Sequence, residues 1–496
     1  MKTIKKLWKY YRDYGSKVLW LKLTRHRKIE EDNYEEWLAE HQITEEERNR
    51  QQSCLFTCMP KISIAVPVYE TPEKFLREMI ESVMVQTYKN WELCIADGSV
   101  SRAAEEIIAK YAAQDHRIKF LRLKENEGIV GNSNRALEIC TGEYVGLLDH
   151  DDVLSEDALY EVVKAINEEN MPGLIYSDED KMNMDSSKYF EPHFKLDFNL
   201  DLLRSNNYIC HFCVIKKEIL NQIGGFRKEF EGAQDYDLIL RSVEKADKIV
   251  HIPKMLYHWR SHQNSTAENP ESKLFAYEAG KRAIEEHLQR MGERGAVEYT
   301  HYFGFYHVKY KLQKSDKVIV VIHGEGSERE RKRCKKSIRR SAGYDNYSFV
   351  FVDNLNELQT DKLNGGYILF VNCKVEMISR GWMKEMLALC QRKDVGVVGI
   401  KLYNKKDETI YHAGIMEGQK GYLFEGFPRE AVGYFHRESL QQDVDAVTKD
   451  FLMISKKDFE VITQNEACVD EIGLGEAIRE LGRIVVADLN IETYRI

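Results

Sequence analysis

The chain has 496 residues, of which 43% are hydrophobic and 31% charged. At ~150 residues per domain, this length predicts about three compact units, and the composition excludes a disordered chain. The 81 Asp and Glu against 72 Lys and Arg give a net charge of −9, which argues against nucleic acid as the main partner. The ten cysteines are scattered, there is no signal-peptide pattern, and no stretch approaches the ~18 consecutive apolar residues of a membrane span. We therefore expect a cytoplasmic protein with reduced thiols.

Positive charge is concentrated in the first 28 residues, which contain ten Lys and Arg against the single Asp13, and residues 30–50 are acidic. Trp8 and Tyr11 fall near helical spacing among these cations. A basic amphipathic helix with aromatic residues at its rim suits an anionic membrane surface. The alternative is a helical hairpin in which the basic and acidic segments pair on the protein body. We expect residues 1–59 to form a helical arm that contacts a membrane through residues 1–28.

From Lys61 onward, short apolar stretches alternate with helical ones. The expected strands cover residues 62–68, 91–96, 118–123 and 144–148, and the expected helices run from Thr71 to about Gln86, through Ile107 to Tyr111, and over about 132–140. Such alternation predicts an α/β fold with a mostly parallel sheet covered by helices on both faces. Ligands of such sheets bind beyond the carboxyl ends of the strands.

Polar residues follow three of these strands, at 67–70, 97–99 and 149–152. Asp149 and Asp151 are one residue apart directly after an apolar strand, and such a pair suits a hard divalent cation and, through it, a diphosphate. Acidic residues after strands also cap helices, but Asp152 or Ser155 is available for that role. The spacing therefore favours a metal site at Asp149 and Asp151.

Six motifs occur in order between residues 61 and 265, namely IAVPVY at 64–69, SVMVQTY at 82–88, LLDHDD at 147–152, YSDED at 176–180, GGF at 224–226 and QDYDL at 234–238. Together they resemble the family 2 glycosyltransferases of the GT-A fold. The resemblance implies a Rossmann-like α/β domain. It also implies transfer of a sugar from a nucleotide-diphosphate donor, with inversion at the anomeric carbon.

The resemblance also assigns roles to residues. Asp149 and Asp151 correspond to the pair that binds Mn²⁺ or Mg²⁺ beneath the donor diphosphate, and His258 corresponds to a third metal ligand, with a packed strand histidine as the alternative. Asp97 corresponds to the carboxylate that binds the pyrimidine of a UDP- or dTDP-sugar. The other residues placed around the nucleotide are Pro67, Tyr69, Glu70, Asn126, Gly128 and Asn134. Gly98 stands where the family often has a second Asp, and Glu70 where Asn is frequent. Because both lie by the nucleotide, these departures leave the choice of base open.

The catalytic base is expected at Asp235. An inverting transfer needs one carboxylate within hydrogen-bond reach of the acceptor hydroxyl. Asp237 lies on the same helix start and is the rival, with capping or orientation as its other role. The place of Asp235 in the motif favours it.

Two other groups remain open. Asp178, Glu179 and Asp180 end an apolar strand, where they either contact acceptor hydroxyls or pair with Lys181. Cys210 and Cys213 have metal-ligand spacing, but no second pair follows, which favours structural cysteines.

The last third of the chain echoes the transferase-like segment. Residues 86–97 are echoed by 342–353 and residues 144–151 by 367–374, but the acidic pair now reads Asn372-Cys373-Lys374. Between the echoed aspartate positions the first copy has 52 residues and the second 19, so the strand and helix that flank the nucleoside are missing. Acids near Asp470 echo the region of Asp235, and we expect no counterpart of His258. Residues 315–496 are therefore expected to form a degenerate, non-catalytic GT-A-like domain, joined through a helix and strand connector at 266–314.

The sequence thus predicts an inverting, metal-dependent glycosyltransferase whose active domain covers residues 60–265. Its expected partners are a nucleotide sugar and a glycan or lipid-linked acceptor, in surface polysaccharide synthesis on the inner face of the cell membrane. The second domain would bind acceptor glycan, form oligomers or brace the first. The alternatives are a bifunctional polymerase with two active sites and a non-catalytic carbohydrate-binding scaffold.

Overall fold

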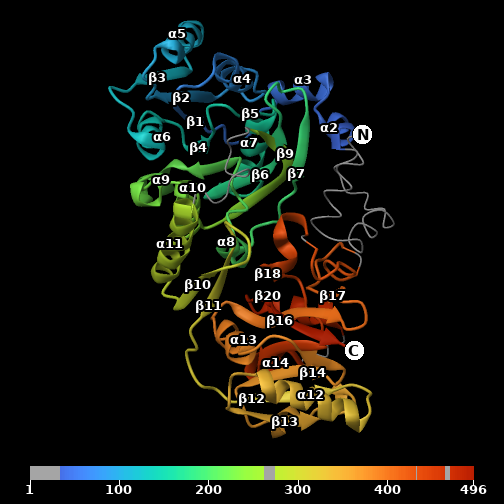
Figure 1. Cartoon of the computed structure of the whole chain (residues 1–496). Coiled ribbons are helices and arrows are strands. Elements are labelled where there is room, and N and C mark those ends of the chain that lie inside the picture. The colour runs from blue at the N-terminus through green and yellow to red at the C-terminus, as the bar shows by residue number, and fades with distance from the viewer. Residues whose placement is uncertain (1–33, 262–273, 420, 432, 464–469) are drawn as a thin grey trace, which may run out of the picture. The chain divides into compact units, whose positions relative to one another are not determined.

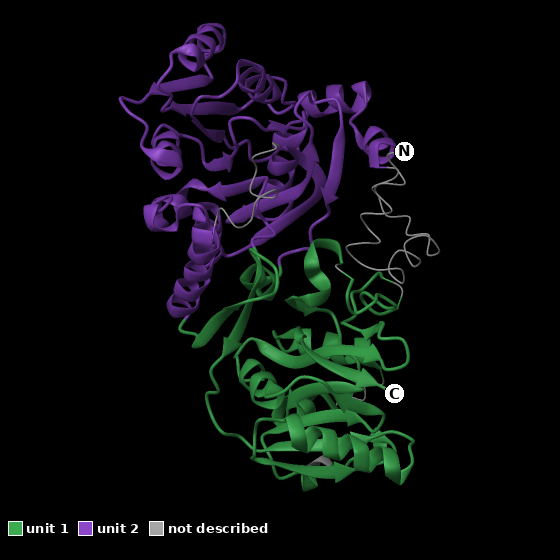
Figure 2. Cartoon of the chain, viewed as in Figure 1, with its two compact units in different colours: residues 1–27, 199–206, 292–496 green, residues 28–198, 207–291 purple. Residues whose placement is uncertain are grey.

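The computed structural model describes residues 34–261, 274–419, 421–431, 433–463 and 470–496. The basic segment at 1–28 lies outside the described residues. The chain divides into two compact units (Figure 2): unit 2 comprises residues 28–198 and 207–291, and unit 1 comprises residues 1–27, 199–206 and 292–496. Each unit contains its own sheet and its own hydrophobic core.

Unit 2 contains a nine-stranded mixed sheet in the order β3-β2-β1-β4-β8-β6-β9-β5, with β7 paired to β6 (Figure 1). Strands β3, β2, β1 and β4 run parallel, β8 is antiparallel to β4 and β6, and β6 is parallel to β9. The strands are β1 (Ile62–Val68), β2 (Trp91–Asp97), β3 (Ile118–Arg122), β4 (Tyr144–Leu147), β5 (Val153–Leu154), β6 (Leu174–Met182), β7 (Tyr189–His193), β8 (Cys213–Lys216) and β9 (Ile249–Arg260).

Both faces of the central strands are covered, because every residue of β1 and of β2 is buried. This explains why these strands read as continuous apolar runs rather than as alternating patterns. The helices of unit 2 are α2 (Tyr34–His41), α3 (Glu45–Ser53), α4 (Glu73–Met84), α5 (Ala103–Gln114), α6 (Gly128–Glu138), α7 (Ala158–Glu168), α9 (Lys217–Ile223), α10 (Gln234–Val243) and α11 (Leu274–Arg290). Helix α6 begins at Gly128, four residues earlier than the sequence pattern suggests.

Unit 1 contains a second nine-stranded sheet, in the order β13-β12-β14-β19-β16-β20-β15, with β17 paired to β16 and β18 to β20. Its strands are β12 (Val318–His323), β13 (Tyr347–Phe351), β14 (Tyr367–Asn372), β15 (Val375–Met377), β16 (Val395–Asn404), β17 (Ile410–His412), β18 (Gln441–Val444), β19 (Phe451–Ser455) and β20 (Ile484–Arg495). A separate hairpin joins β10 (Gly295–Tyr299) to β11 (Tyr306–Tyr310). The helices are α8 (Leu200–Ser205), α12 (Glu328–Ser341), α13 (Trp382–Cys390), α14 (Lys456–Thr463) and α15 (Glu471–Glu480).

The two sheets share one plan. The order β2-β1-β4-β8-β6-β9-β5 in unit 2 becomes β13-β12-β14-β19-β16-β20-β15 in unit 1, and each corresponding pair has the same relative direction. The expected fold class, an α/β GT-A-like sheet in two tandem copies, is confirmed. In unit 1 the order starts at β13, so the described residues include no counterpart of β3.

The loss of β3 has a clear place in the chain. Between β2 and β4, unit 2 contains α5, β3 and α6, whereas between β13 and β14 unit 1 contains only the short 3₁₀ turns Leu355–Glu357 and Thr360–Lys362. The shorter segment described between β13 and β14 thus lacks counterparts of α5, β3 and α6. The order of the other strands is the same in both sheets.

Candidate functional site

The carboxyl ends of β1, β2 and β4 bring most of the expected residues of unit 2 to one edge of the sheet. Asp97 ends β2 and is fully buried. One carboxylate oxygen accepts a hydrogen bond from the Ser99 N–H at 2.8 Å, and the other pairs with the Arg122 guanidinium from β3. Asp97 thus fixes the loop after β2 at the place where a ligand of this sheet would enter.

Glu70 holds the same loop from the end of β1. Its carboxylate accepts hydrogen bonds from the backbone N–H groups of Val100 and Ser101 at 2.7 and 2.9 Å, and from the Ser101 hydroxyl at 2.8 Å. The bonds from Ser101, followed by that from Val100, lower the pKa of Glu70 below its usual range. Beside it, Pro67 is buried within β1 and Tyr69 is 44% exposed. Glu70, one of the two departures from the family pattern, therefore joins the loops after β1 and β2.

Gly98 is the other departure, and packing explains it. A Cβ atom at residue 98 would lie 2.7 Å from the Asn132 side-chain nitrogen. Asn132 is buried and donates a 3.0 Å hydrogen bond to the Asn126 side chain, which also accepts from the Gly128 N–H at 3.0 Å. An aspartate at residue 98 would require this bonded group to move.

Asn126 and Gly128 lie together at the start of α6, as expected, but Asn134 serves a different contact. The Asn134 side chain donates to the Phe226 carbonyl at 2.9 Å and accepts from the Phe226 N–H at 2.8 Å. A Cβ at Gly225, whose φ is +73°, would approach the Asn134 oxygen to 2.6 Å. Asn134 therefore holds the Gly224-Gly225-Phe226 turn against α6.

The loop after β4 carries Asp149 and Asp151 and is held by β9. The Tyr257 hydroxyl donates to the Asp152 carboxylate at 2.5 Å and accepts from the Asp149 N–H at 3.3 Å. Arg260 donates to the Asp151 carbonyl at 2.6 Å and, through its backbone N–H, to Asp152 at 2.7 Å. The Asp149 side chain is 52% exposed and that of Asp151 is 18% exposed, so both are accessible from the sheet edge.

These carboxylates form a negative cluster. Burial, and after it the charges of Asp151 and Asp149, raise the pKa of Asp152 well above its usual range. A divalent cation would relieve this repulsion, and carboxylate oxygens are the ligands that Mg²⁺ and Mn²⁺ prefer. The donor set present at Asp149 and Asp151 therefore fits the expected metal.

His258 lies on β9, where its Nδ1 is 2.6 Å from an Asp180 oxygen, and Asp180 also accepts a 2.6 Å hydrogen bond from the Tyr34 hydroxyl. Within the described residues, no cluster of three ligand atoms lying within 4.8 Å of one another combines His258 with Asp149 and Asp151. His258 lies opposite Val153 of β5, the strand that follows the loop with Asp149 and Asp151. Its direct side-chain partner is Asp180.

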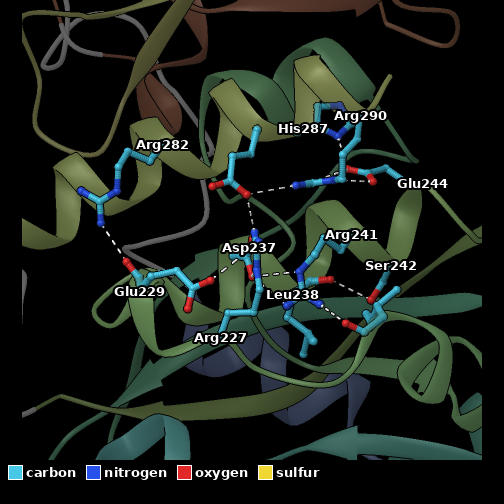
Figure 3. A network of polar contacts seen from close by, with 12 residues as sticks. Arg227, Glu229, Asp237, Leu238, Arg241, Ser242, Glu244, Arg282, His287 and Arg290 are labelled. Carbon is cyan, nitrogen blue, oxygen red and sulfur yellow. Dashed lines mark hydrogen bonds and ion pairs between the residues drawn. The ribbon is translucent and has the colours of Figure 1, made fainter. Parts of the chain in front are cut away.

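Asp235 and Asp237 begin α10 and have opposite surroundings. Asp237 is fully buried and paired with Arg227 at 2.5 Å and with Arg241 at 2.7 Å (Figure 3). Asp235 is half-buried, and its carboxylate accepts a 3.2 Å hydrogen bond from the Gln234 side chain. Burial and the charge of Asp149 raise the pKa of Asp235 to about 6, against a lowering effect of His211. Asp235 therefore has the surroundings of a general base, and Asp237 those of a structural anchor.

Glu179 and His211 were not identified as a pair from the sequence. Glu179 Oε2 is 3.1 Å from His211 Nδ1 and 3.4 Å from Lys195 Nζ. His211 stacks on Tyr257 with ring centroids 4.5 Å apart, and its Nε2 is 3.8 Å from Asp149 Oδ2. The histidine thus lies between the acidic loop after β4 and Glu179 of β6.

The YSDED motif could have pointed to this pairing, because its three acids end one strand. Of the two roles left open for these acids, the ion pair with Lys181 does not form among the described residues, because Lys181 pairs with Glu191 at 2.6 Å. Each acid has a histidine partner: Asp178 contacts His251, Glu179 contacts His211 and Asp180 contacts His258. Cys213 lies buried in β8, as expected of a structural cysteine.

In unit 1 the corresponding sheet positions carry different chemistry. The Asn372 side chain donates to Asp450 at 2.8 Å, and Lys374 stands two residues after it, where unit 2 has Asp151. Strand β20 does provide a counterpart of His258, contrary to expectation: Arg495 pairs with Val375 of β15 as His258 pairs with Val153 of β5. Arg495 lies 2.9 Å from Asp450. Two cations thus occupy positions where a metal site would need anionic or neutral ligands.

Comparison with known proteins decides the family. Residues 63–224 match the model of Glycosyl transferase family 2. This part of the chain is a family 2 glycosyltransferase domain. The resemblance inferred from the six motifs is confirmed, and the matched range of the transferase domain includes Asp97, Asp149 and Asp151.

Two curated relatives extend beyond the transferase domain. An uncharacterized protein, y4gI, of Sinorhizobium fredii is 36% identical over 81% of this chain and 49% of its own length. The O-antigen biosynthesis protein RfbC of Myxococcus xanthus is 28% identical over 92% of this chain and 39% of its own length. The chain therefore spans half or less of the length of these two relatives.

Among solved structures, the chain is similar to S. aureus TarS 1-349 in complex with UDP. The two are 20% identical, with a TM-score of 0.37 over 46% of this chain and 65% of the other.

Proposed function

We propose that residues 60–265 form the catalytic domain of an inverting, metal-dependent glycosyltransferase of polysaccharide synthesis. The observation that carries the proposal is Asp235, a half-buried carboxylate with a pKa of about 6, whose charge interacts with that of Asp149. A general base works best when its pKa lies near the working pH. The relatives named for O-antigen biosynthesis and, at 26% identity over 42% of this chain, for chondroitin synthase support the choice of a polysaccharide product.

Each group of residues has a role in this proposal. Asp97 and the loop held by Glu70 receive the pyrimidine of a UDP- or dTDP-sugar, beside Tyr69. Asp149 and Asp151 would hold Mn²⁺ or Mg²⁺, with His258, now in contact with Asp180, as the third ligand, and the bound ion would supply positive charge to the departing diphosphate. Asp235 accepts the proton of the acceptor hydroxyl while the acceptor oxygen bonds to the anomeric carbon and the bond from that carbon to the diphosphate breaks.

Residues 315–496 are proposed to transfer nothing and to bind acceptor glycan or brace the protein. Lys374 at the Asp151 position and Arg495 at the His258 position support this role over a second active site. The intact set of acids in unit 2 supports an enzyme over a carbohydrate-binding scaffold.

We further propose that the protein acts at the inner face of the cell membrane on a glycan or lipid-linked acceptor, with residues 1–28 in contact with the bilayer. The ten cations of that segment support the contact. Among the residues that the structure describes, no helix has both the length and the apolar character required to cross a bilayer.

Donor hydrolysis by the full chain tests the proposal. UDP- and dTDP-sugars are assayed with Mn²⁺ or Mg²⁺ and with a chelator, using wild type, Asp151→Ala and Lys374→Ala. We expect metal-dependent turnover that Asp151→Ala lowers at least ~100-fold, whereas Lys374→Ala, at the matching position of the second sheet, leaves it unchanged. No turnover with any nucleotide sugar, or full turnover by Asp151→Ala, overturns the proposal. Loss of turnover in Lys374→Ala alone would favour a site in unit 1.

A further inference from the structure

Helix α12 of unit 1 is strongly basic. Its 14 residues include eight Arg and Lys against two Glu, in a chain whose net charge is −9. Only Arg331 and Lys332 form ion pairs with described residues, with Asp353 and Glu328 respectively. The other six cations of the helix have no described acidic partner within 4.0 Å. The helix therefore carries a surplus of positive charge that the described part of the protein does not neutralise.

Aromatic side chains of β13 lie within 6 Å of two of these cations. Lys335 Nζ lies 5.1 Å from the centre of the Phe349 ring and 5.4 Å from that of Phe351, and the Arg339 guanidinium lies 5.6 Å from Phe349. These residues and Tyr347 line a cleft of about 460 Å³, which also includes Asp345 and Ser348. We call the surface formed by Lys335, Arg339, Tyr347, Phe349 and Phe351 the α12–β13 face.

The other sheet shows why this face is open. By strand register, Tyr347, Phe349 and Phe351 take the positions of Trp91, Leu93 and Ile95 in unit 2. There the three side chains belong to a core that includes Ile107 and Ile108 of α5, and Trp91 is 2% exposed. In unit 1 the chain between β13 and β14 contains no helix of that kind, and Phe351 is 41% exposed.

Three aromatic residues at these positions, two of which are aliphatic in unit 2, lie next to cations without described acidic partners and indicate a surface with a partner. The charge defines that partner as anionic, and the aromatic rings require an apolar layer next to the anionic groups. A bilayer with acidic headgroups offers both, because cations pair with the headgroups while aromatic rings occupy the interface. A second copy of the chain is a poorer occupant, because an isologous contact would bring the two basic helices together.

We propose that the α12–β13 face is a docking surface for anionic phospholipid membranes. It is independent of the proposed reaction and lies in a different part of the chain from the basic segment at 1–28. Lys335 and Arg339 pair with lipid phosphates, and Phe349 and Phe351 lie at the level of the headgroups. Unit 1 in this view holds the protein on the membrane rather than transferring sugar.

Vesicle flotation with the full chain tests this inference. The probes are phosphatidylcholine vesicles with and without 30% phosphatidylglycerol. We expect binding only to the anionic vesicles, and the double variant Lys335→Gln/Arg339→Gln to weaken partitioning about 30-fold, at about 1 kcal/mol for each cation near the surface. The matched control is Lys110→Gln/Lys406→Gln, which removes two exposed lysines elsewhere and gives the same net charge. Residues 1–28 are identical in all variants, so they do not contribute to the difference.

Two further measurements make the result decisive. Phe351→Ser keeps every charge and is expected to weaken binding several-fold, because it removes an exposed ring from the interface. Donor hydrolysis by both Gln variants is expected to equal that of wild type, which reports an intact fold. Equal loss in both double variants, no loss in Lys335→Gln/Arg339→Gln, or binding to a 20-base-pair RNA duplex in place of vesicles overturns the proposal.

Discussion

Asp235 and Asp237 are two residues apart on one helix, yet the surrounding charges give them different chemistry. Asp237 is fully buried and lies between two guanidinium groups, with which it forms an ion-pair network (Figure 3). Asp235 interacts with the negative charge of Asp149, and burial further disfavours its ionised form. The ion pairs of Asp237 stabilise the turn between α9 and α10. The surroundings of Asp235 raise its proton affinity at the sheet edge.

Substitution of each aspartate by asparagine should separate the two roles. Asp235→Asn removes the base, and we expect a loss of 10²- to 10⁴-fold in transfer rate with an unchanged melting temperature. Asp237→Asn leaves Arg227 and Arg241 without their carboxylate, and we expect about 3 kcal/mol of lost unfolding free energy. Steady-state kinetics and urea denaturation of both variants measure this, and a stable Asp237→Asn that is as inactive as Asp235→Asn would reverse the assignment.

The pH dependence of transfer gives a second residue-scale prediction. Asp235 acts when it is deprotonated, and its pKa is raised from 3.8 to about 6. The rate is therefore expected to fall about tenfold for each pH unit below 6, rather than only below 4. Values of kcat/KM between pH 4.5 and pH 8 measure the profile, and a rate that stays constant down to pH 4.5 contradicts it.

At the scale of elements, one buried histidine joins three parts of unit 1. His307 of β11 lies 3.1 Å from Glu385 of α13 and 3.4 Å from Asp488 of β20. Burial alone would lower the pKa of His307, but Asp488, and after it Glu385, raise this pKa to about 10. The hairpin β10–β11 is therefore attached to the second sheet by a charged imidazole at neutral pH.

The pKa of His307 is higher in the folded state than its unfolded value of about 6.5. Its stabilisation of the fold is therefore complete below pH 6.5 and is lost as the pH rises towards 10. We expect the unfolding free energy to fall by about 3 kcal/mol between pH 6.5 and 9.5 from this group. His307→Gln should remove that slope, whereas His301→Gln, an exposed histidine of the same hairpin, should keep it. Urea denaturation at several pH values measures the slopes, and equal slopes in the two variants would show that His307 is not the group responsible.

Much of this architecture follows from local sequence. Apolar runs ending in Asp97 and Asp149 identify the strands and the edge where their carboxyl ends meet, and the echoed segments reveal the second sheet and its missing strand. The pairing of Asp237 with Arg241 follows from their i,i+4 spacing on α10. Its pairing with Arg227 does not, because Arg227 reaches α10 only through the fold of the turn at Gly224 and Gly225.

The pairing of His211 with Glu179 could not be predicted from the sequence, because it also depends on the tertiary fold. The two residues are 32 positions apart and meet only through the register of β6 with β8. The position of Arg495 was likewise missed, because it is defined by strand pairing and not by a motif. The bonds of Asn134 to the backbone of Phe226 could not be predicted either, because a backbone partner leaves no side-chain signal in the sequence.

At the scale of the whole molecule, two sheets of the same order differ in the residues at their carboxyl edges. Asp149 and Asp151 in unit 2 face the exterior of the sheet edge, whereas Asn372 and Lys374 take these positions in unit 1. The duplication has thus kept the packing of the sheet and changed the chemistry of one copy.

Nucleotide binding should therefore slow amide hydrogen exchange in the sheet of unit 2 and leave that of unit 1 unchanged. With UDP and Mn²⁺ at about 100 times the dissociation constant, we expect about 2.7 kcal/mol of stabilisation and slower amide exchange at residues 97–101 and 149–152. The matching residues 353–355 and 372–375 should exchange at the same rate with and without ligand. Hydrogen exchange of the full chain measures both, with Asp151→Ala as the control that loses the protection, and equal slowing in both copies would contradict a single donor site.

The absence of β3 from the second sheet also bears on how such enzymes diversify. The second sheet forms without α5, β3 and α6, so the strand order does not depend on these three elements. In the first sheet they occupy one continuous stretch, residues 103–138, whereas Asp97, Asp149, Asp151 and Asp235 all lie outside it. We therefore expect that this stretch can be exchanged between family 2 domains while Asp97 and the reacting carboxylates stay on their native strands.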